Sequence, residues 1–380
     1  MSHWREEITI YIHLPWCTSK CPYCDFNSFL RTEFIQEDLY VNTLLVDLDE
    51  ELELVSHRIV SSIYIGGGTP SLFNSELIAK LLAGVAERMT LGPEVEITLE
   101  MNPESACLTK LEAYKRSGVN RISIGVQSFS DDVLTALSRP HDSEKAKEAV
   151  ILAREAGFEN INIDLMFGVP SGNHDSDMSD LNQAILLHPD HISRYQLTIE
   201  EGTKFHAAPP RVPDEDDIYR SYQDGFKLLS TAGFTRYEVS AYSRSGKASR
   251  HNLHYWGYGD YIGIGAGAHG KVTIGSNIYR SIKVNSPTLY VRKGKEKRLN
   301  QDKKLVSKED ALIEYAINAT RLIDGFEMSD LYDKTGTSPG AIDINNKITK
   351  AENAGFLVRE GGHIKPTVQG QLFLNDLQLI

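Results

Sequence analysis

Three of the four cysteines of this chain lie close together near its N-terminus. Cys17, Cys21 and Cys24 follow the spacing C-x3-C-x2-C. Thiolates are soft ligands that hold iron–sulfur clusters, and a four-iron, four-sulfur cluster normally takes four of them. No fourth cysteine follows nearby, so three thiolates leave one iron open to a second molecule. The spacing therefore predicts a 4Fe-4S cluster used for chemistry or ligand binding.

Zinc is the alternative metal for these cysteines. A structural zinc ion takes four ligands, often from two C-x2-C pairs, and the second pair is missing here. His13 would have to serve as the fourth ligand. The remaining cysteine, Cys107, stands alone, and we expect a small core or surface residue there. So few cysteines argue against a disulfide framework and fit a reducing, cytoplasmic location.

The composition is that of a soluble protein. The 380 residues carry a formal net charge of −12, which argues against broad nucleic-acid binding. We interpret the basic stretch at 292–304 as a solvated loop. The N-terminus lacks the apolar stretch of a signal peptide, and no apolar run approaches the roughly 20 residues that span a bilayer. We expect no nucleic-acid partner and no membrane-spanning segment.

Short β-rich runs alternate with amphipathic helical stretches over the first ~200 residues, a period typical of a parallel sheet with helical crossovers. We predict an α/β fold with a partial (β/α)6 barrel. The strands are expected at 8–12, 62–65, 95–99, 121–126, 160–167 and 191–198. The helices between them are expected at 36–55, 75–89, 108–117, 143–156 and 176–187.

Polar or glycine-rich features follow the predicted strands, where the site of a βα barrel lies. The cysteines follow the first strand and Gly66, Gly67 and Gly68 follow the second. Glu100 and Gln127 end the next two strands, and Asp164 lies on the fifth. One such feature is unremarkable, but five successive strand ends indicate a shared pocket.

Three regions are predicted. Residues 1–205 form the barrel, 206–300 form an extension with a helix at 214–231 and a strand at 236–241, and 301–380 form a C-terminal α+β domain. In that last region a helix at 310–323 and a strand pair around 356–365 suggest a winged-helix-like module.

Several motifs taken together resemble a known family. They are YIHLPWC, CPYCDFNS, GGGTPS, GVQSF, NIDLMFGVP, RYQLTIEEGT and HNLHYW. In this order they are similar to the coproporphyrinogen III oxidase-like branch of the radical S-adenosylmethionine (radical SAM) superfamily, and most of all to its heme-chaperone members. The resemblance implies that S-adenosylmethionine chelates the open iron of the cluster. It also implies heme-acceptor proteins and a second copy of the chain as partners.

The resemblance also implies which residues contact S-adenosylmethionine. Tyr11 and Tyr23 would flank it, with Tyr23 near the adenine, and the glycine motif would meet its methionyl end. The full set is Tyr11, Tyr23, Gly67, Gly68, Thr69, Glu100, Gln127, Arg139, Asp164 and, as a weaker candidate, Thr198.

The segment HNLHYW suggests a second ligand. Histidine is a common heme-iron ligand, and Tyr255 and Trp256 offer flat apolar surface for a macrocycle. By resemblance the heme site would contain His251, Asn252, Tyr255 and Trp256. His251 is the first candidate for the iron ligand and His254 the alternate, since spacing does not separate them.

Two departures distinguish this chain from the oxidative decarboxylase of the same branch. That enzyme carries another cysteine two residues after the third cluster cysteine, where this chain has Phe26, and it has a longer segment ahead of the cluster loop. We therefore expect a heme chaperone without catalytic residues of its own. The alternative is an oxygen-independent coproporphyrinogen III oxidase, and a third hypothesis is a zinc-stabilised barrel without redox chemistry.

Overall fold

The structure, a computed structural model, describes residues 5–31, 36–340 and 344–379. Within these residues twelve strands form one sheet, in the order β14-β13-β12-β11-β1-β4-β5-β6-β7-β8-β10-β9. The six predicted strands run parallel at its centre. They are β1 (Glu7–Leu14), β4 (Ile59–Gly67), β5 (Thr90–Met101), β6 (Arg121–Gln127), β7 (Ile161–Phe167) and β8 (His191–Gln196). The predicted partial barrel is confirmed.

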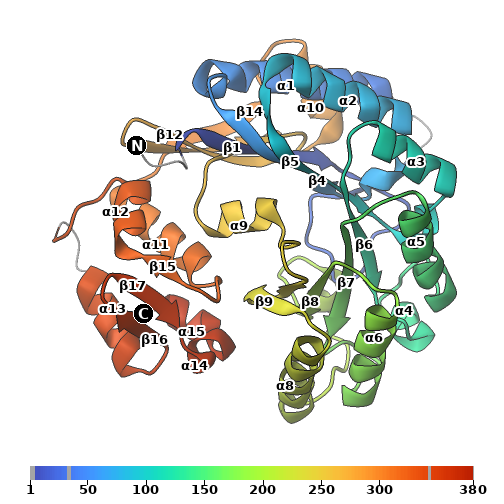
Figure 1. The fold of residues 1–380 in the computed structure, drawn as a ribbon. Coiled ribbons are helices and arrows are strands. Elements are labelled where there is room, and N and C mark those ends of the chain that lie inside the picture. The colour runs from blue at the N-terminus through green and yellow to red at the C-terminus, as the bar shows by residue number, and fades with distance from the viewer. Residues whose placement is uncertain (1–4, 32–35, 341–343, 380) are drawn as a thin grey trace.

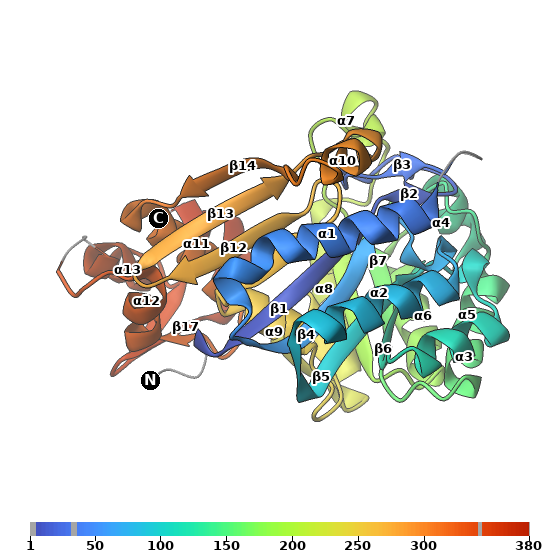
Figure 2. The same ribbon diagram turned by 90° about the horizontal axis from the view of Figure 1, so that it is seen from above.

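Helices cover the outer face of this curved sheet (Figures 1 and 2). Polar caps fix where several begin: the side chain of Asn74 accepts the Glu76 N–H, and that of Asp142 accepts the Lys145 N–H. The covering helices are α1 (Glu37–Val55), α2 (Ser75–Arg88), α3 (Leu108–Arg116), α5 (Ser143–Glu155), α6 (His174–Leu186) and α8 (Glu215–Thr231).

The two faces of the central strands differ in character. Along β1, Ile8, Ile10 and Ile12 are fully buried on one face. Thr9 and Tyr11 alternate with them on the other, as the two-residue period of a strand requires. Parallel sheets are usually apolar on both faces. A polar inner face therefore indicates that the barrel interior binds something.

The extension lengthens the same sheet at both edges. β11 (Tyr261–Ile264) pairs parallel with β1, and an antiparallel ladder follows it. That ladder consists of β12 (His269–Ile274), β13 (Asn277–Lys283) and β14 (Asn300–Leu305). At the far edge the single predicted strand is a hairpin of β9 (Thr235–Glu238) and β10 (Ala241–Ser243). The Ser240 N–H donates to the Glu238 carboxylate at the turn that divides it.

The basic stretch predicted as a loop has regular structure. It forms the end of α10 (Pro287–Gly294) and the edge strand β14, whose side chains are mostly exposed. Lysines on an exposed edge strand discourage pairing with another chain. The lysines are therefore solvated, as predicted, but the backbone is paired.

Buried ion pairs attach the extension to the barrel. Asp260, just before β11, accepts from Arg58 and from Lys271, each at 2.6 Å. Burial raises the pKa of Asp260, but the two cations outweigh it and lower that pKa to about 2. Lys283 on β13 likewise contacts Asp47 of α1 at 2.6 Å. Removing one member of such a pair leaves an uncompensated buried charge, so the pairs fix how the extension sits.

The C-terminal domain packs around a second core, which includes Tyr315, Phe326 and Ile364 and which Tyr258 and Ile278 of the extension join. The predicted strand pair is present, and the short β15 adds a third strand. Its elements are α11 (Lys308–Ala319), β15 (Phe326–Glu327), α12 (Met328–Thr335), α13 (Ile344–Asn353), β16 (Leu357–Glu360), β17 (His363–Pro366), α14 (Val368–Leu372) and α15 (Leu374–Leu379). Within the described ranges, every helix falls short of the length and apolar character that crossing a bilayer requires.

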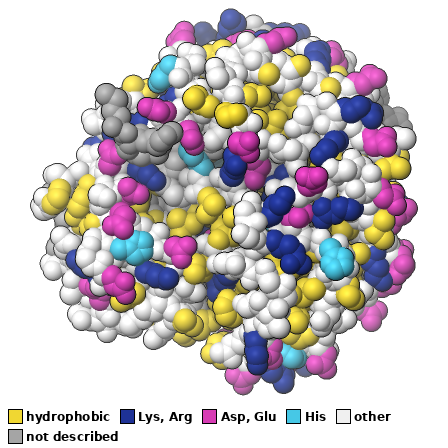
Figure 3. Space-filling view, in the orientation of Figure 1, with side chains coloured by type: hydrophobic (Ala, Val, Ile, Leu, Met, Phe, Trp, Pro, Cys, Tyr) yellow, Lys and Arg dark blue, Asp and Glu magenta, His cyan; other side chains and the backbone are white. Residues whose placement is uncertain are grey.

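Surface charge is mixed rather than segregated. Acidic and basic side chains are interspersed over the barrel and the C-terminal domain on the face shown in Figure 3. In the same orientation, α9 (Arg250–Trp256) lies at the centre, on the inner side of the sheet (Figure 1). This short helix is the HNLHYW segment, so the fold brings it to the polar inner face.

Candidate functional site

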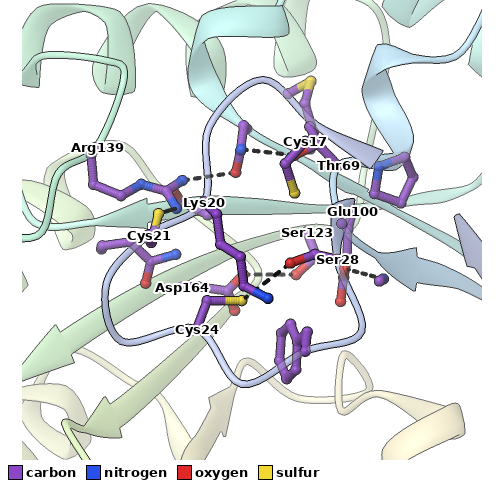
Figure 4. Close-up of a pocket in the computed structure, with 18 of the residues that line it drawn as sticks. Cys17, Lys20, Cys21, Cys24, Ser28, Thr69, Glu100, Ser123, Arg139 and Asp164 are labelled. Carbon is purple, nitrogen blue, oxygen red and sulfur yellow. Dashed lines mark hydrogen bonds between the residues drawn. The ribbon is translucent and has the colours of Figure 1, made fainter. Parts of the chain in front are cut away.

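The clustered cysteines lie on one loop beyond the C-terminal end of β1 (Figure 4). Two short strands, β2 (Trp16–Cys17) and β3 (Phe29–Leu30), pair at the two ends of this loop. The Phe29 N–H donates to the Pro15 carbonyl at 2.7 Å, and the Arg31 N–H donates to that of Cys17 at 2.8 Å. These bonds close the loop and hold the cysteines at its base and tip.

The three sulfur atoms surround a common space rather than a single point (Figure 4). Among the described residues, no three His, Cys, Asp or Glu side chains are gathered as a single metal ion requires. A four-iron cluster does not need that convergence, because each thiolate binds a different iron. Burial raises the pKa of Cys17 and Cys24, so these thiols stay protonated until a metal displaces the proton.

His13 is not placed to complete a zinc site. Its Nε2 lies 2.9 Å from the Asn27 carbonyl, and its Nδ1 lies 2.9 Å from the Tyr11 hydroxyl. The carbonyl only accepts, so Nε2 donates to it and Nδ1 accepts from Tyr11. Burial lowers the pKa of His13, which fits this neutral tautomer. Both ring nitrogens already have partners, and the donor set fits the cluster better than zinc.

A cavity of about 230 Å³ lies between the cluster loop and the strand ends, and we call it the first cavity. It brings together residues of the cluster loop and of five strands, β4, β5, β6, β7 and β8. The predicted residues that line it are Cys17, Cys21, Tyr23, Cys24, Gly67, Gly68, Thr69, Glu100, Gln127, Arg139 and Asp164. The expectation of a shared pocket at the strand ends therefore agrees with the geometry.

The glycine motif joins β4 to the cluster loop. The Gly68 N–H donates to the Leu14 carbonyl, and the Thr69 N–H donates to that of Trp16, both at 2.8 Å. A Cβ on Gly68 would lie 2.6 Å from the Trp16 oxygen, and Gly67 has a φ of +118°. Only glycine fits both demands. These donors are already used within the chain, so the motif primarily fixes the loop that carries the cysteines.

Two half-buried carboxyl groups, those of Glu100 and Asp164, face the first cavity. Glu100 accepts from the Tyr64 hydroxyl at 2.8 Å and from the Gly67 N–H at 3.2 Å. Burial raises the pKa of Glu100 to about 7, and the nearby Asp164 adds to the rise. Burial raises the pKa of Asp164 as well. Two carboxyl groups held in this way favour a positively charged ligand, whose charge would stabilise their ionised forms.

Arg139 reaches the cavity from the segment after β6. Its guanidinium donates to Asn102 Oδ1 at 2.7 Å and to the Gly125 carbonyl at 3.0 Å. It also lies 3.5 Å from the Cys21 sulfur. Within the described residues its buried Nε has no hydrogen-bond partner, a feature that a ligand would satisfy. Gln127 adopts a φ of +69°, which is uncommon for a residue other than glycine.

Of the residues predicted to contact S-adenosylmethionine, Tyr23, Tyr11 and Thr198 lie in three different surroundings. Tyr23 lines the first cavity and packs against Phe205, whose N–H donates to the carbonyl of Pro22 in the cluster loop. Tyr11 is among the described residues that line a second cavity rather than the first. Thr198 is exposed and lines neither, because β8 ends at Gln196, before the predicted end of the strand.

The second cavity adjoins the first and has a volume of about 900 Å³. It lies between the cluster loop, α9 and the strands β1 and β11. The predicted residues that line it are Tyr11, His251, Asn252, Tyr255 and Trp256. Residues that line both cavities are Lys20, Phe26, Ser28, Tyr64, Gly67 and Glu100. A volume near 1,000 Å³ is at the upper end of the range for ligand pockets.

His251 is buried at the wall of the second cavity. Its Nδ1 lies 2.9 Å from the Ser62 hydroxyl, which leaves Nε2 as the ring nitrogen free for coordination. Burial lowers the pKa of His251 to about 3, so the imidazole is neutral at physiological pH. A neutral imidazole with its other nitrogen engaged is the form that binds heme iron.

His254 points away from that cavity. Its Nε2 lies 2.8 Å from the Asp260 carbonyl, to which it donates. A Cβ on Gly259 would lie 2.2 Å from this nitrogen, so the turn packs directly against the ring. His254 is not among the described residues that line the second cavity. The geometry therefore favours His251 of the two candidates.

The aromatic pair of α9 supplies one wall of the second cavity. Tyr255 and Trp256 pack edge-to-face with ring centroids 5.0 Å apart, and the Arg321 guanidinium lies 4.3 Å from the Trp256 ring centroid. The buried Trp256 Nε1 has no hydrogen-bond partner within the described residues. These residues fit a flat macrocycle that carries polar groups at its edge.

Phe26 lies two residues after Cys24, the last cysteine of the cluster loop. Its side chain is 58% exposed and lines both cavities. An exposed phenyl ring at this junction provides apolar contact surface instead of a thiol.

The sequence patterns did not indicate Tyr64, which lines both cavities, or Glu96, which holds the start of α9. Tyr64 and Glu96 carried no motif of their own, although both lie on the polar face of a predicted strand. Glu96 accepts from the backbone N–H groups of Arg250 and His251 at the start of α9, at 3.1 and 3.2 Å. The two-residue alternation along β4 and β5 was the available signal.

Comparisons with known proteins show which family the chain belongs to. The Radical SAM superfamily model matches residues 11–181, and the HemN C-terminal domain model matches residues 306–373. The chain is 41% identical to the heme chaperone HemW of Haemophilus influenzae, over 97% of this chain and 96% of that protein. It is also 41% identical to the heme chaperone HemW of Escherichia coli, over 97% of both chains.

Among solved structures, coproporphyrinogen III oxidase (HemN) from Escherichia coli superimposes with a TM-score of 0.81. That match covers 99% of this chain and 90% of that one, at 20% identity, so it shows the fold alone. The fold and the site together define a radical SAM protein. Within that superfamily the chain belongs to the HemW family. The superfamily implies a 4Fe-4S cluster and S-adenosylmethionine.

Proposed function

We propose that this chain is a cytoplasmic heme chaperone. It binds heme in the second cavity and passes it to acceptor proteins, with the cluster and S-adenosylmethionine in the first. The observation that carries the proposal is His251, a neutral imidazole with its Nδ1 engaged, at the wall of a large cavity beside the cluster loop. The relatives named heme chaperones support the assignment over nearly the whole chain.

In the first cavity, Cys17, Cys21 and Cys24 hold the cluster, which when loaded supplies an electron able to cleave the sulfonium of S-adenosylmethionine. Glu100 and Asp164 face the positive charge of S-adenosylmethionine, and Arg139 holds the carboxylate side of that molecule in place. The remaining contacts are with Tyr23, Gly67, Gly68, Thr69 and Gln127. Tyr11 and Thr198 stay weaker candidates, since the described lining residues of this cavity do not include them.

In the second cavity, His251 binds the heme iron through Nε2, and Tyr255 and Trp256 pack against the macrocycle. Asn252 and the Trp256 Nε1 donate to polar groups at its edge, a role that the unpartnered indole nitrogen supports. Lys20 lines both cavities and offers a positive charge toward the propionates. Heme-acceptor proteins, and a second copy of the chain, are the proposed partners.

The alternative function is oxygen-independent coproporphyrinogen III oxidase. The fold is shared with that enzyme, but Phe26 stands where it has a cysteine. We expect that cluster-loaded protein, incubated anaerobically with coproporphyrinogen III, S-adenosylmethionine and a low-potential reductant, forms no protoporphyrinogen. A decarboxylase of this branch in the same buffer serves as the positive control. Stoichiometric protoporphyrinogen from this chain would establish the oxidase instead.

A further inference from the structure

Tyr64 lies in the wall that the two cavities share. Its hydroxyl donates to Glu100 Oε1 of the first cavity at 2.8 Å. Its ring lies against the ring of His251 in the second cavity, with centroids 5.0 Å apart and planes inclined by 31°. One side chain thus contacts both a proposed S-adenosylmethionine residue and the proposed heme ligand.

The strand that carries Tyr64 restricts how this contact can move. Ser62, Tyr64 and Gly66 share the inner face of β4, and Ser62 contacts His251 Nδ1 at 2.9 Å. A Cβ on Gly66 would lie 3.0 Å from the Tyr64 ring and 3.1 Å from the Glu100 carboxyl group. Tyr64 and Glu100 therefore pack directly against the backbone of Gly66, which leaves the pair no room to move toward β4.

The neighbouring strand β5 also serves both cavities. It presents Glu100 to the first cavity and Glu96, four residues earlier on the same face, to the start of α9. Glu96 accepts from the His251 N–H at 3.2 Å and from the Ser249 hydroxyl at 3.2 Å. The backbone of His251 is thus held by β5 and its ring by β4. Tyr64 is the contact through which a change at Glu100 reaches that ring.

The strength of the hydrogen bond between Tyr64 and Glu100 depends on whether Glu100 is protonated. Because burial raises the pKa of Glu100 to about 7, part of the population is protonated at neutral pH. A cationic ligand in the first cavity favours the ionised carboxylate. A carboxylate accepts a shorter and stronger hydrogen bond from a tyrosine hydroxyl than a carboxylic acid does. A ligand of this kind would therefore hold Tyr64 more firmly against His251.

We propose that Tyr64 is a positioning residue that couples the two cavities. S-adenosylmethionine in the first cavity strengthens heme binding in the second, and heme strengthens S-adenosylmethionine binding by the same factor, as linkage requires. The coupling rests on the proposed function, because it assigns heme to His251. The coupling also predicts when heme is released, because the chain holds heme more weakly once S-adenosylmethionine has left.

The test is a heme titration of cluster-loaded protein, followed in the Soret band with and without saturating S-adenosylmethionine. In the wild type we expect the ligand to lower the heme Kd by about fivefold or more. In Tyr64→Phe the ring remains but the hydroxyl is lost, and the ratio of the two Kd values should fall to within about twofold of unity. Tyr219→Phe, an exposed tyrosine on α8, should keep the wild-type ratio.

A reciprocal measurement separates coupling from a general structural effect. Equilibrium dialysis of S-adenosylmethionine with and without heme should give the same factor in the wild type, and that factor should be lost in Tyr64→Phe. Wild-type protein that binds heme with a Kd indifferent to S-adenosylmethionine would overturn the coupling and leave the proposed function standing. An undiminished factor in Tyr64→Phe would overturn the role of Tyr64. Wild-type protein that binds no heme would overturn the proposed function itself.

Discussion

Replacing His251 with alanine should abolish tight heme binding. The substitution removes the neutral imidazole that faces the second cavity and leaves the aromatic wall of α9 in place. Residual apolar contact with the macrocycle then remains, but the iron loses its ligand. Loss of a residue that only hydrogen-bonds to a metal ligand already costs about 10–100-fold in metal affinity, so loss of the ligand itself should lower heme affinity by about 100-fold or more. A Soret titration of purified protein measures this directly.

His254→Gln is the matched control, three residues further along the same helix. Its Nε2 donates to the Asp260 carbonyl, so the loss costs about one hydrogen bond, on the order of 1 kcal/mol of stability. Heme affinity should change little. Retained heme in His251→Ala together with lost heme in His254→Gln would reverse the assignment of the ligand.

Replacing any one of Cys17, Cys21 or Cys24 with alanine should prevent the cluster from assembling stably. Each thiolate binds a different iron, so the loss of one leaves a second iron of the cluster without a protein ligand. We expect loss of the broad absorbance near ~400 nm that iron–sulfur clusters show, together with loss of bound iron and sulfide. The fold should survive, since the barrel core consists of apolar residues from the strands and helices.

Cys107→Ala controls for the loss of a thiol as such. Cys107 is exposed at the start of α3 and is not among the described residues that line the first cavity, so this variant should assemble a full cluster. Wild-type iron and sulfide content in all three cluster-loop variants would refute the cluster assignment. Zinc without iron or sulfide in the wild type would refute it as well.

Much of the barrel could be predicted because each βα unit has its own local sequence signals. Apolar runs, helix caps and glycines mark the six strands and their crossovers without reference to the rest of the chain. The parallel pairing of β11 with β1 could not be predicted in this way, because it joins residues 9–12 to 261–264. Such pairing depends on contacts such as that of Asp260 with Arg58, which no local pattern specifies.

The same limit applies to the candidate site. Strand ends indicated the first cavity, because parallel strands finish at one edge of the sheet. Spacing alone could not show that His251 faces the second cavity while His254 packs against a turn. His251 and His254 lie almost one turn apart, and they differ only because the turn at Gly259 closes over the second ring. Tyr64 was missed for a similar reason: its partners Glu100 and His251 come from different parts of the chain.

Saturable binding of heme by the wild type tests the central claim most directly. Cluster-loaded protein should be titrated with heme, followed in the Soret band, and then passed through a desalting column to remove heme that is loosely adsorbed. We expect saturation at one heme per chain, with a histidine-ligated spectrum that survives the column. Absence of a saturable Soret signal, or heme lost entirely on the column, would contradict it.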